Sequence, residues 1–292
     1  MLPFVFIDPT RLGPVQPWGF FLALGFLVGD ACWMRRAKLL GYDTKSFRAY
    51  VIWLMVMGFF LSHVLDEIFY HPDEIARRPW SLFFVWEGLS SLGGFIGALV
   101  GGLGWKYLDV HWRGPLPFLS PRPRPLPLLP FADVSAATFP VGWVFGRLGC
   151  ALVHDHPGAL ARAGAFLSVA WPLSAEDGLH HTFGPIHAVY GSTARYDLGL
   201  LEFLFSVVLA SALVMTWERR LPIGTYLCAT ALAYSPVRFF MDFLRARDDV
   251  PGGDLRQGGL TFAQWSCIAF FLVGLGMAWR LLRPTRLGAM RV

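Results

Sequence analysis

Charged residues are scarce in this sequence. Only 15% of its 292 residues are Asp, Glu, Lys or Arg, whereas a soluble globular domain has about 25%. Apolar residues make up 55% of the chain, and the mean hydropathy is +0.49. This balance excludes an ordinary soluble domain and predicts an integral membrane protein that crosses the bilayer several times.

Cysteine is scarce as well, and no two cysteines form a C-x-x-C pair. All four lie in apolar segments, at Cys32, Cys150, Cys228 and Cys267. We therefore expect neither a disulfide framework nor a metal or cofactor site, and interpret the cysteines as small buried hydrophobic residues. A basic stripe interleaved with aromatic residues is also lacking, which excludes nucleic acid as a partner.

Long apolar segments dominate what is present. They predict an all-α polytopic membrane protein in which residues 1–292 form a single integral membrane domain. Each segment is close to the ~20 residues that a helix needs to cross a bilayer. A polar loop is expected at about 154–197. The seven predicted spans are about 17–34, 50–70, 82–105, the apolar part of 133–158, 198–216, 223–243 and 262–282.

The basic residues are distributed unevenly between the two sets of loops. The loops after the first, third, fifth and seventh predicted spans carry 15 of the 25 Lys and Arg, while the N-terminus and the remaining loops carry eight. Because Lys and Arg concentrate on the cytoplasmic side of a membrane, we expect the N-terminus outside and the C-terminus inside. The polar loop 154–197 then faces the outer side.

Two arginines interrupt the apolar segments, Arg147 near the outer end of the fourth span and Arg238 near that of the sixth. A guanidinium keeps its charge in apolar surroundings, so it needs a carboxylate, a phosphate or water. Asp242 follows Arg238 by four residues and Arg245 comes three later, so a structural ion pair is one interpretation. Snorkelling of Arg147 to the headgroups is another. Two arginines at the same depth favour the joint binding of a lipid phosphate.

Two further groups of residues have more than one interpretation. Gly93 and Gly94 let a backbone approach closely, either to a neighbouring helix or to a lipid headgroup. The sequence His154-Asp155-His156 offers metal-ligating side chains, but without a third clustered ligand a solvated outer loop is favoured over a metal site.

Several motifs together resemble those of the bacterial prolipoprotein diacylglyceryl transferases. The stretch G-R-L-G-C at 146–150 resembles the G-R-x-G-N-F signature of that family. The residues W-E-G at 86–88, followed by G-G-F-I-G at 93–97, resemble its W-x-G-G-x-S-x-H-G-G-L-I-G segment. The stretch 234–245 matches Y-x-x-x-R-F-x-x-E-x-x-R. The resemblance extends from about Gly13 to Gly276, with further matches at Asp133, Pro140, Gly142, Gly158, Glu202, Thr261 and Gln264.

This resemblance implies a multi-pass enzyme of the bacterial inner membrane, with its site near the periplasmic face. Diacylglyceryl would pass from phosphatidylglycerol to a cysteine of a lipoprotein precursor, and glycerol phosphate would leave. Arg147 and Arg238 would bind the phosphate, Asp155 and Asp242 would orient them, and Tyr234 or a loop histidine would accept a proton. The other candidate substrate-binding residues are Gly93, Gly94, Gly146, Gly149, Gly158, Glu202 and Arg245.

Three departures from the family pattern keep a second function open. Leu92 stands where the family has His, Cys150 replaces the signature Asn, and residues 196–202 keep only the Leu and Glu of H-P-S-Q-L-Y-E. The chain is therefore either a transferase acting on a cysteine thiol or a different acceptor, or a catalytically silent phospholipid-binding membrane protein.

The charge bias generates a prediction about topology. With the C-terminus in the cytoplasm, alkaline phosphatase fused there should be inactive and a fluorescent protein should be bright, because the first matures only outside and the second folds inside. The opposite pattern would reverse the orientation and place the arginines at the cytoplasmic face.

Overall fold

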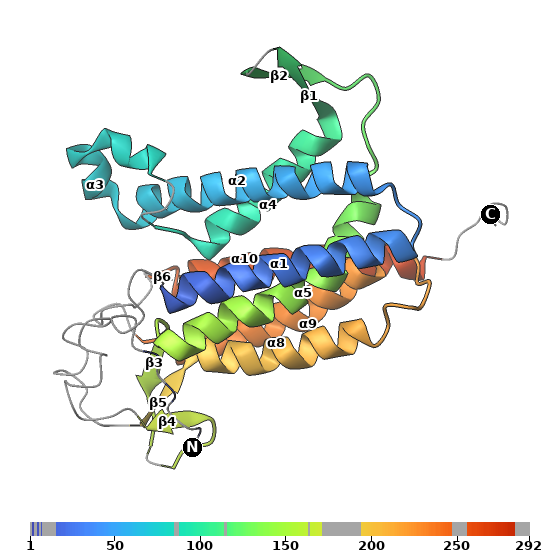
Figure 1. The fold of residues 1–292 in the computed structure, drawn as a ribbon. Coiled ribbons are helices and arrows are strands. Elements are labelled where there is room, and N and C mark those ends of the chain that lie inside the picture. The colour runs from blue at the N-terminus through green and yellow to red at the C-terminus, as the bar shows by residue number, and fades with distance from the viewer. Residues whose placement is uncertain are drawn as a thin grey trace. The chain divides into compact units, whose positions relative to one another are not determined.

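The structure is a computed structural model that describes residues 2, 5, 7, 16–84, 88–113, 116–162, 164–170, 194–246 and 256–283. The chain divides into two compact units (Figure 1). The first unit comprises residues 1–33 and 135–292, and the second unit comprises residues 34–134. Helices α1 (Pro17–Leu39) and α5 (Leu128–Val153) each contribute to both units. Whether the two units act as the single membrane domain expected from the sequence stays a prediction.

The first unit is a group of long apolar helices that run alongside one another (Figure 1). Besides its parts of α1 and α5, it contains α8 (Leu198–Val214), α9 (Thr225–Met241) and α10 (Phe262–Leu282). A short 3-10 helix, η4 (Asp242–Leu244), continues α9. The helix starts are set by their sequences: Asp197 accepts a hydrogen bond from the Leu200 amide at the start of α8, and Thr261 with Gln264 forms a capping box at the start of α10.

Two small antiparallel sheets lie at the ends of these helices. Strand β5 (Ala194–Asp197) pairs with both β3 (Pro157–Leu160) and β4 (Ser168–Ala170), and β6 (Arg256–Gln257) pairs with β7 (Leu260–Thr261). The long apolar segments are helices, as the all-α prediction expected. The expected loop 154–197, however, contains a three-stranded sheet. Residues 171–193 of that loop lie outside the described part of the chain.

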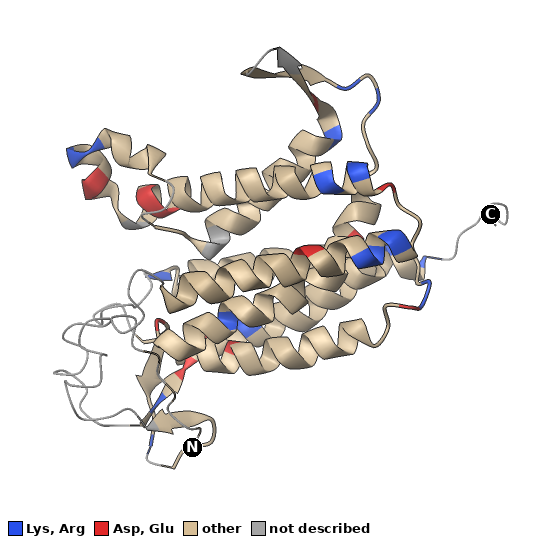
Figure 2. Ribbon diagram, in the orientation of Figure 1, with Lys and Arg blue, Asp and Glu red and all other residues tan. Residues whose placement is uncertain are grey.

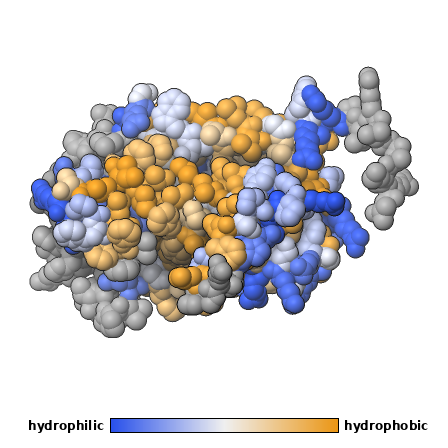
Figure 3. Space-filling view, turned by 90° about the horizontal axis from the view of Figure 1, so that it is seen from above, coloured by the Kyte–Doolittle hydropathy of each residue, from blue (hydrophilic) through white to orange (hydrophobic). Residues whose placement is uncertain are grey.

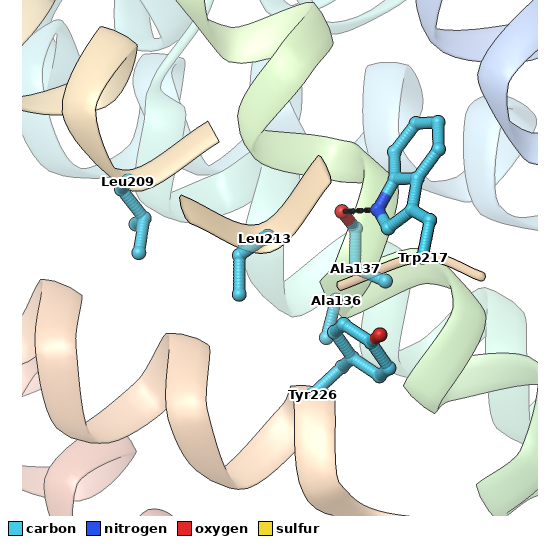
Figure 4. Close-up of a cluster of buried hydrophobic side chains, with 6 residues drawn as sticks. All are labelled: Ala136, Ala137, Leu209, Leu213, Trp217 and Tyr226. Atoms are coloured by element: carbon cyan, nitrogen blue, oxygen red, sulfur yellow. Dashed lines mark hydrogen bonds between the residues drawn. The ribbon is translucent and has the colours of Figure 1, made fainter. Parts of the chain in front are cut away.

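A buried cluster fixes three helices of the first unit to one another (Figure 4). Its members are Ala136 and Ala137 of α5, Leu209 and Leu213 of α8, Tyr226 of α9, and Trp217, which follows α8. The indole nitrogen of Trp217 donates to the carbonyl of Ala137 over 3.2 Å. Because its polar group is satisfied, this indole can remain in the apolar interior.

The second unit is a tightly packed helical pair with short attached elements. Helix α2 (Thr44–Tyr70) lies along α4 (Ser91–Tyr107), and α3 (Pro72–Arg77) and the 3-10 helix η2 (Pro79–Phe83) join them. An antiparallel hairpin of β1 (Leu108–Arg113) and β2 (Leu116–Pro121) follows α4. The third span was expected from 82, but α4 begins only at Ser91, because Ser90 caps it by accepting from the Gly93 amide.

Glycines spaced four residues apart bring α4 against α2. A Cβ on Gly93 would stand 2.7 Å from Ser62 Cα, and one on Gly97 would stand 2.7 Å from Gly58 Cα. Gly93 therefore has the helix-packing role. A Cβ on Gly94 would meet only Ser62 Oγ, at 4.0 Å, so Gly94 is not needed for this close contact. That Gly93 and Gly94 bind substrate stays a prediction.

Helix length and composition confirm that the chain is a membrane protein. Among the described residues, four helices are long and apolar enough to cross a bilayer, at Pro17–Leu39, Thr44–Phe69, Leu128–Val153 and Phe262–Leu282, and α8 is a shorter apolar helix. Charged residues are sparse along the helices and gather toward their ends (Figure 2), and apolar side chains gather over the middle of the face seen in Figure 3. That α4 and α9, of 17 residues each, also span stays a prediction.

The contact between α1 and α5 generates a stability prediction. A Cβ on Gly142 would lie 2.8 Å from the carbonyl oxygen of Gly25, whereas on Gly146 the nearest atom would be Leu22 Cδ1 at 3.9 Å. We expect Gly142→Ala to lower the free energy of unfolding by ~1–3 kcal/mol through overpacking. Gly146→Ala should be neutral or raise it, because alanine is favoured over glycine inside a helix. Thermal unfolding in the same detergent compares them, and equal midpoints would contradict the close α1–α5 contact.

Candidate functional site

Glu202 lies between the two arginines that the sequence singles out. Its Oε1 is 3.1 Å from Arg147 Nε, and its Oε2 is 3.3 Å from Arg238 Nε. The three side chains come from α8, α5 and α9, and each is less than one tenth exposed. Within the described part of the chain, Arg147 Nε makes no well-aligned hydrogen bond, so its attraction to Glu202 is chiefly ionic. The structure thus brings Arg147 and Arg238 to one carboxylate.

Two aromatic residues complete the surroundings of Glu202. The Trp143 indole donates to Oε1 over 3.1 Å, and the Tyr234 hydroxyl donates to the same oxygen. The Trp143 ring also lies against the Arg147 guanidinium, with Cζ 4.6 Å from the ring centroid. Because Tyr234 already donates its proton to Glu202, its expected role as a proton acceptor stays a prediction without added geometric support.

Asp242 forms a second centre of charge next to the first. Its Oδ1 accepts from Arg238 Nη1 over 2.6 Å and from Arg245 Nε over 2.8 Å. The Thr261 hydroxyl donates to Oδ2, and Thr261 is also the residue that caps α10. Gln264 of that capping box donates to the Phe239 carbonyl over 3.2 Å. The end of α9 and the start of α10 are therefore held together by the same hydrogen bonds that orient Arg238.

The cluster gathers several guanidiniums around two buried carboxylates. Arg147 and Arg238 lie beside Glu202, and Arg238 and Arg245 lie beside Asp242. Among the described residues, none is bonded to Nη2 of Arg147 or of Arg238. An anion could accept hydrogen bonds from these two donors.

The chain that follows α5 is held to the site by polar contacts and by one glycine. His154 adopts a left-handed φ of 52° and its Nδ1 bonds Asp197, the residue that caps α8. Gly158 forms a bridge with Arg245, and a Cβ there would lie 2.6 Å from the Tyr196 carbonyl oxygen and 2.8 Å from that of Leu244. Gly158 thus permits the close backbone approach that places Arg245 beside Asp242.

The resemblance implied that Asp155 orients Arg147. In the structure, the carboxylate beside Arg147 is that of Glu202. Asp155 instead bonds His156 Nδ1. His156 Nε2 lies 3.5 Å from Arg147 Nη1. Burial alone would lower the pKa of His156, but the adjacent Asp155 carboxylate and the Cys150 sulfur raise it to about 9. His156 therefore carries its proton at neutral pH.

Cys150 lies among polar groups rather than in purely apolar surroundings. The Trp18 indole donates to Sγ over 3.3 Å, and Arg147 Nη1 is 4.0 Å away. The potential metal-ligating atoms of Cys150, Asp155 and His156 lie within 4.8 Å of one another. Cys150 therefore supplies the third clustered ligand that could not be found from the sequence. A cation there would be repelled by Arg147, which approaches both Cys150 and His156. The arrangement suits a proton or a negative charge better than a metal ion.

The remaining candidates pack between helices. Gly149 faces α1, where a Cβ would lie 3.2 Å from Phe21 Cβ and 3.3 Å from Trp18 Cα, and Gly146 faces Leu22 more loosely. Contact of either glycine with a ligand stays a prediction. The sequence reading missed Trp143, although its position four residues before Arg147 places it on the same face of α5.

A family of known proteins matches almost the whole chain. The family profile described as prolipoprotein diacylglyceryl transferase matches residues 10–280. The chain belongs to this family. Similar relatives are phosphatidylglycerol–prolipoprotein diacylglyceryl transferases. The relative from Nitratidesulfovibrio vulgaris is 30% identical over 97% of both chains. The relative from Staphylococcus saprophyticus is 24% identical over 94% of this chain and 90% of its own length. The relative from Acinetobacter baumannii is 27% identical over 96% of this chain and 94% of its own length.

The position of Glu202 generates a prediction about stability. Glu202→Gln keeps the shape but leaves two buried guanidiniums without their shared carboxylate, so it should lower the free energy of unfolding by ~3–5 kcal/mol. The exposed Glu218 offers the control, because Glu218→Gln should shift the thermal midpoint little. Similar midpoints for both variants would show that Glu202 does not hold the arginines.

Proposed function

We propose that this chain is a phospholipid-dependent diacylglyceryl transferase that takes diacylglyceryl from a phosphatidylglycerol-like donor. The observation that carries the proposal is the pair of buried guanidiniums on either side of Glu202, each of which has an Nη2 donor that no described residue uses. A phosphodiester carries one negative charge and has two oxygens for paired N–H donors. At the depth of these side chains in a membrane, a phospholipid is the natural source of a phosphate.

The proposed reaction uses the cluster to stabilise the leaving group. Arg147 and Arg238 bind the donor phosphate. As an acceptor nucleophile attacks the glyceryl carbon, the C–O bond to phosphate breaks and negative charge grows on the departing glycerol phosphate. Guanidiniums that Glu202 and Asp242 hold in place stabilise that charge without reorganising. The relatives' printed names support a prolipoprotein as the acceptor, and a different acceptor is the other possibility left open by the sequence.

The second candidate function is that of a silent phospholipid-binding membrane protein. Leu92 favours it, because the resemblance aligns this position with the family His and an aliphatic side chain cannot accept a proton. Both candidates share the phosphate site, a multi-pass location in the bacterial inner membrane and a site near the periplasmic face. They differ only in whether a product forms.

Product analysis separates the two candidates. Purified protein is incubated with labelled phosphatidylglycerol and a peptide that carries the cysteine motif of lipoprotein precursors, and all lipid and peptide products are weighed. Release of glycerol phosphate together with a diacylglyceryl adduct supports the transferase. Bound but unchanged lipid supports the silent binder.

The phosphate site itself is tested by replacing arginine with lysine. Arg147→Lys and Arg238→Lys keep the charge but lose the planar fork that bonds two oxygens at once. We expect phosphatidylglycerol affinity to fall by ~1–3 kcal/mol, the scale of a hydrogen bond to a charged group, which is about five- to 150-fold. Native mass spectrometry or lipid displacement measures this. Arg219→Lys, at an exposed position after α8, is the matched control. Unchanged lipid retention in both site variants, with folding intact, would leave these arginines as structural ion pairs.

A further inference from the structure

Cys150, His156 and Asp155 stand in the order of a nucleophile, a base and an orienting carboxylate. Asp155 bonds His156 Nδ1, which leaves Nε2 as the ring nitrogen that faces the interior. The ligating atoms of all three side chains lie within 4.8 Å of one another. This order recurs in enzymes that transfer acyl groups through a covalent intermediate, where the third residue fixes the orientation of the imidazole.

The sulfur also has hydrogen-bond donors that stabilise negative charge. The Trp18 indole is 3.3 Å from Sγ and Arg147 Nη1 is 4.0 Å from it. A buried cysteine that serves only as a small hydrophobic residue has no need for two such donors. Donors of this kind stabilise negative charge that develops on the sulfur during a reaction.

The sulfur is less exposed than the two side chains beside it. Cys150 is only 5% exposed, whereas the side chains of His156 and Asp155 are 28% and 32% exposed. Arg147 approaches both Cys150 and His156, so it would repel a metal cation bound there.

We propose that Cys150, His156 and Asp155 form a second reactive centre, in which Cys150 is a nucleophile toward acyl esters. In the proposed resting state the proton of the Cys150 thiol is on His156, and the thiolate attacks the ester carbonyl carbon. The C–O bond of the ester breaks, His156 returns the proton to the departing alcohol oxygen, and the acyl group remains on Cys150 as a thioester. Trp18 and Arg147 stabilise negative charge on the sulfur before the attack. The centre shares Arg147 with the proposed phosphate site, but the reaction differs from diacylglyceryl transfer, which breaks a C–O bond to phosphate.

Thiol reactivity is the first test, and the chain carries its own control. Cys267 is as buried as Cys150, at 7% and 5% exposure. Full-length protein in lipid-free detergent is treated with iodoacetamide, and each cysteine is followed by peptide mass spectrometry. We expect Cys150 to be alkylated at least about tenfold faster than Cys267, and His156→Gln to remove most of that difference. His111→Gln, in the exposed β1–β2 hairpin, should leave it unchanged. Equal rates at the two cysteines would overturn the proposal.

Acylation is the second test, with p-nitrophenyl butyrate as the probe. The expected result is a stoichiometric burst of p-nitrophenolate and a butyryl group on Cys150 that neutral hydroxylamine removes, both absent in Cys150→Ala. A missing adduct, or stoichiometric zinc binding that Cys150→Ala abolishes, would overturn the assignment. Because neither probe contains phosphate, failure here is distinguishable from failure of the phospholipid site, which the lipid retention of Arg147→Lys reports.

Discussion

The attraction between one buried carboxylate and two guanidiniums is the interaction on which the first unit depends. Glu202 is 2% exposed and draws Arg147 from α5 and Arg238 from α9 to α8. Removing these ions from water costs several kcal/mol each, and only the mutual attraction in a medium of low polarity offsets that cost. The three helices are thereby fixed at one depth along their length. The apolar cluster around Trp217 supplies packing, but apolar contacts alone do not specify which turns of the helices face one another.

The ionic contacts also fix the orientation of the guanidiniums. Asp242 bonds both Arg238 and Arg245, and Thr261 ties that carboxylate to α10. The planar groups are therefore held in place by several helices rather than by one. A phosphate bound as proposed above would meet donors that are already oriented, and its binding would add to the stability of the fold.

Much of the fold was readable from the sequence, because each helix carries its own apolar run and several carry their own caps. The last span was predicted at the observed residues, since Thr261 and Gln264 mark its start locally. The start of α4 was misplaced, because the apolar run already begins near residue 82 and conceals the cap at Ser90. The sheet of β3, β4 and β5 was missed, because its pairing joins segments that are distant in sequence.

The sequence indicated several residues of the site, but it did not indicate all of the contacts between them. Arg147 and Arg238 stood out because charge is expensive in an apolar segment. That Glu202 joins them, rather than Asp155, depends on how α8 is rotated, which no local pattern records. Asp242 was paired correctly because its partners are three and four residues away on one helical face. The surroundings of Cys150 were not predictable, since Trp18 reaches it from the beginning of the chain.

The contact of Gly25 with Gly142 has a consequence for how the protein is made. The two glycines belong to the first unit, yet the ribosome synthesises all of residues 34–134 between them. Helix α1 therefore enters the membrane long before its partner exists, and its small-residue face stays open to lipid or to an insertion factor during that interval. The second unit can pair α2 with α4 meanwhile, because both lie within one continuous stretch. The charged site can be completed only when α8, α9 and α10 have been synthesised, because each of them contributes a side chain to it.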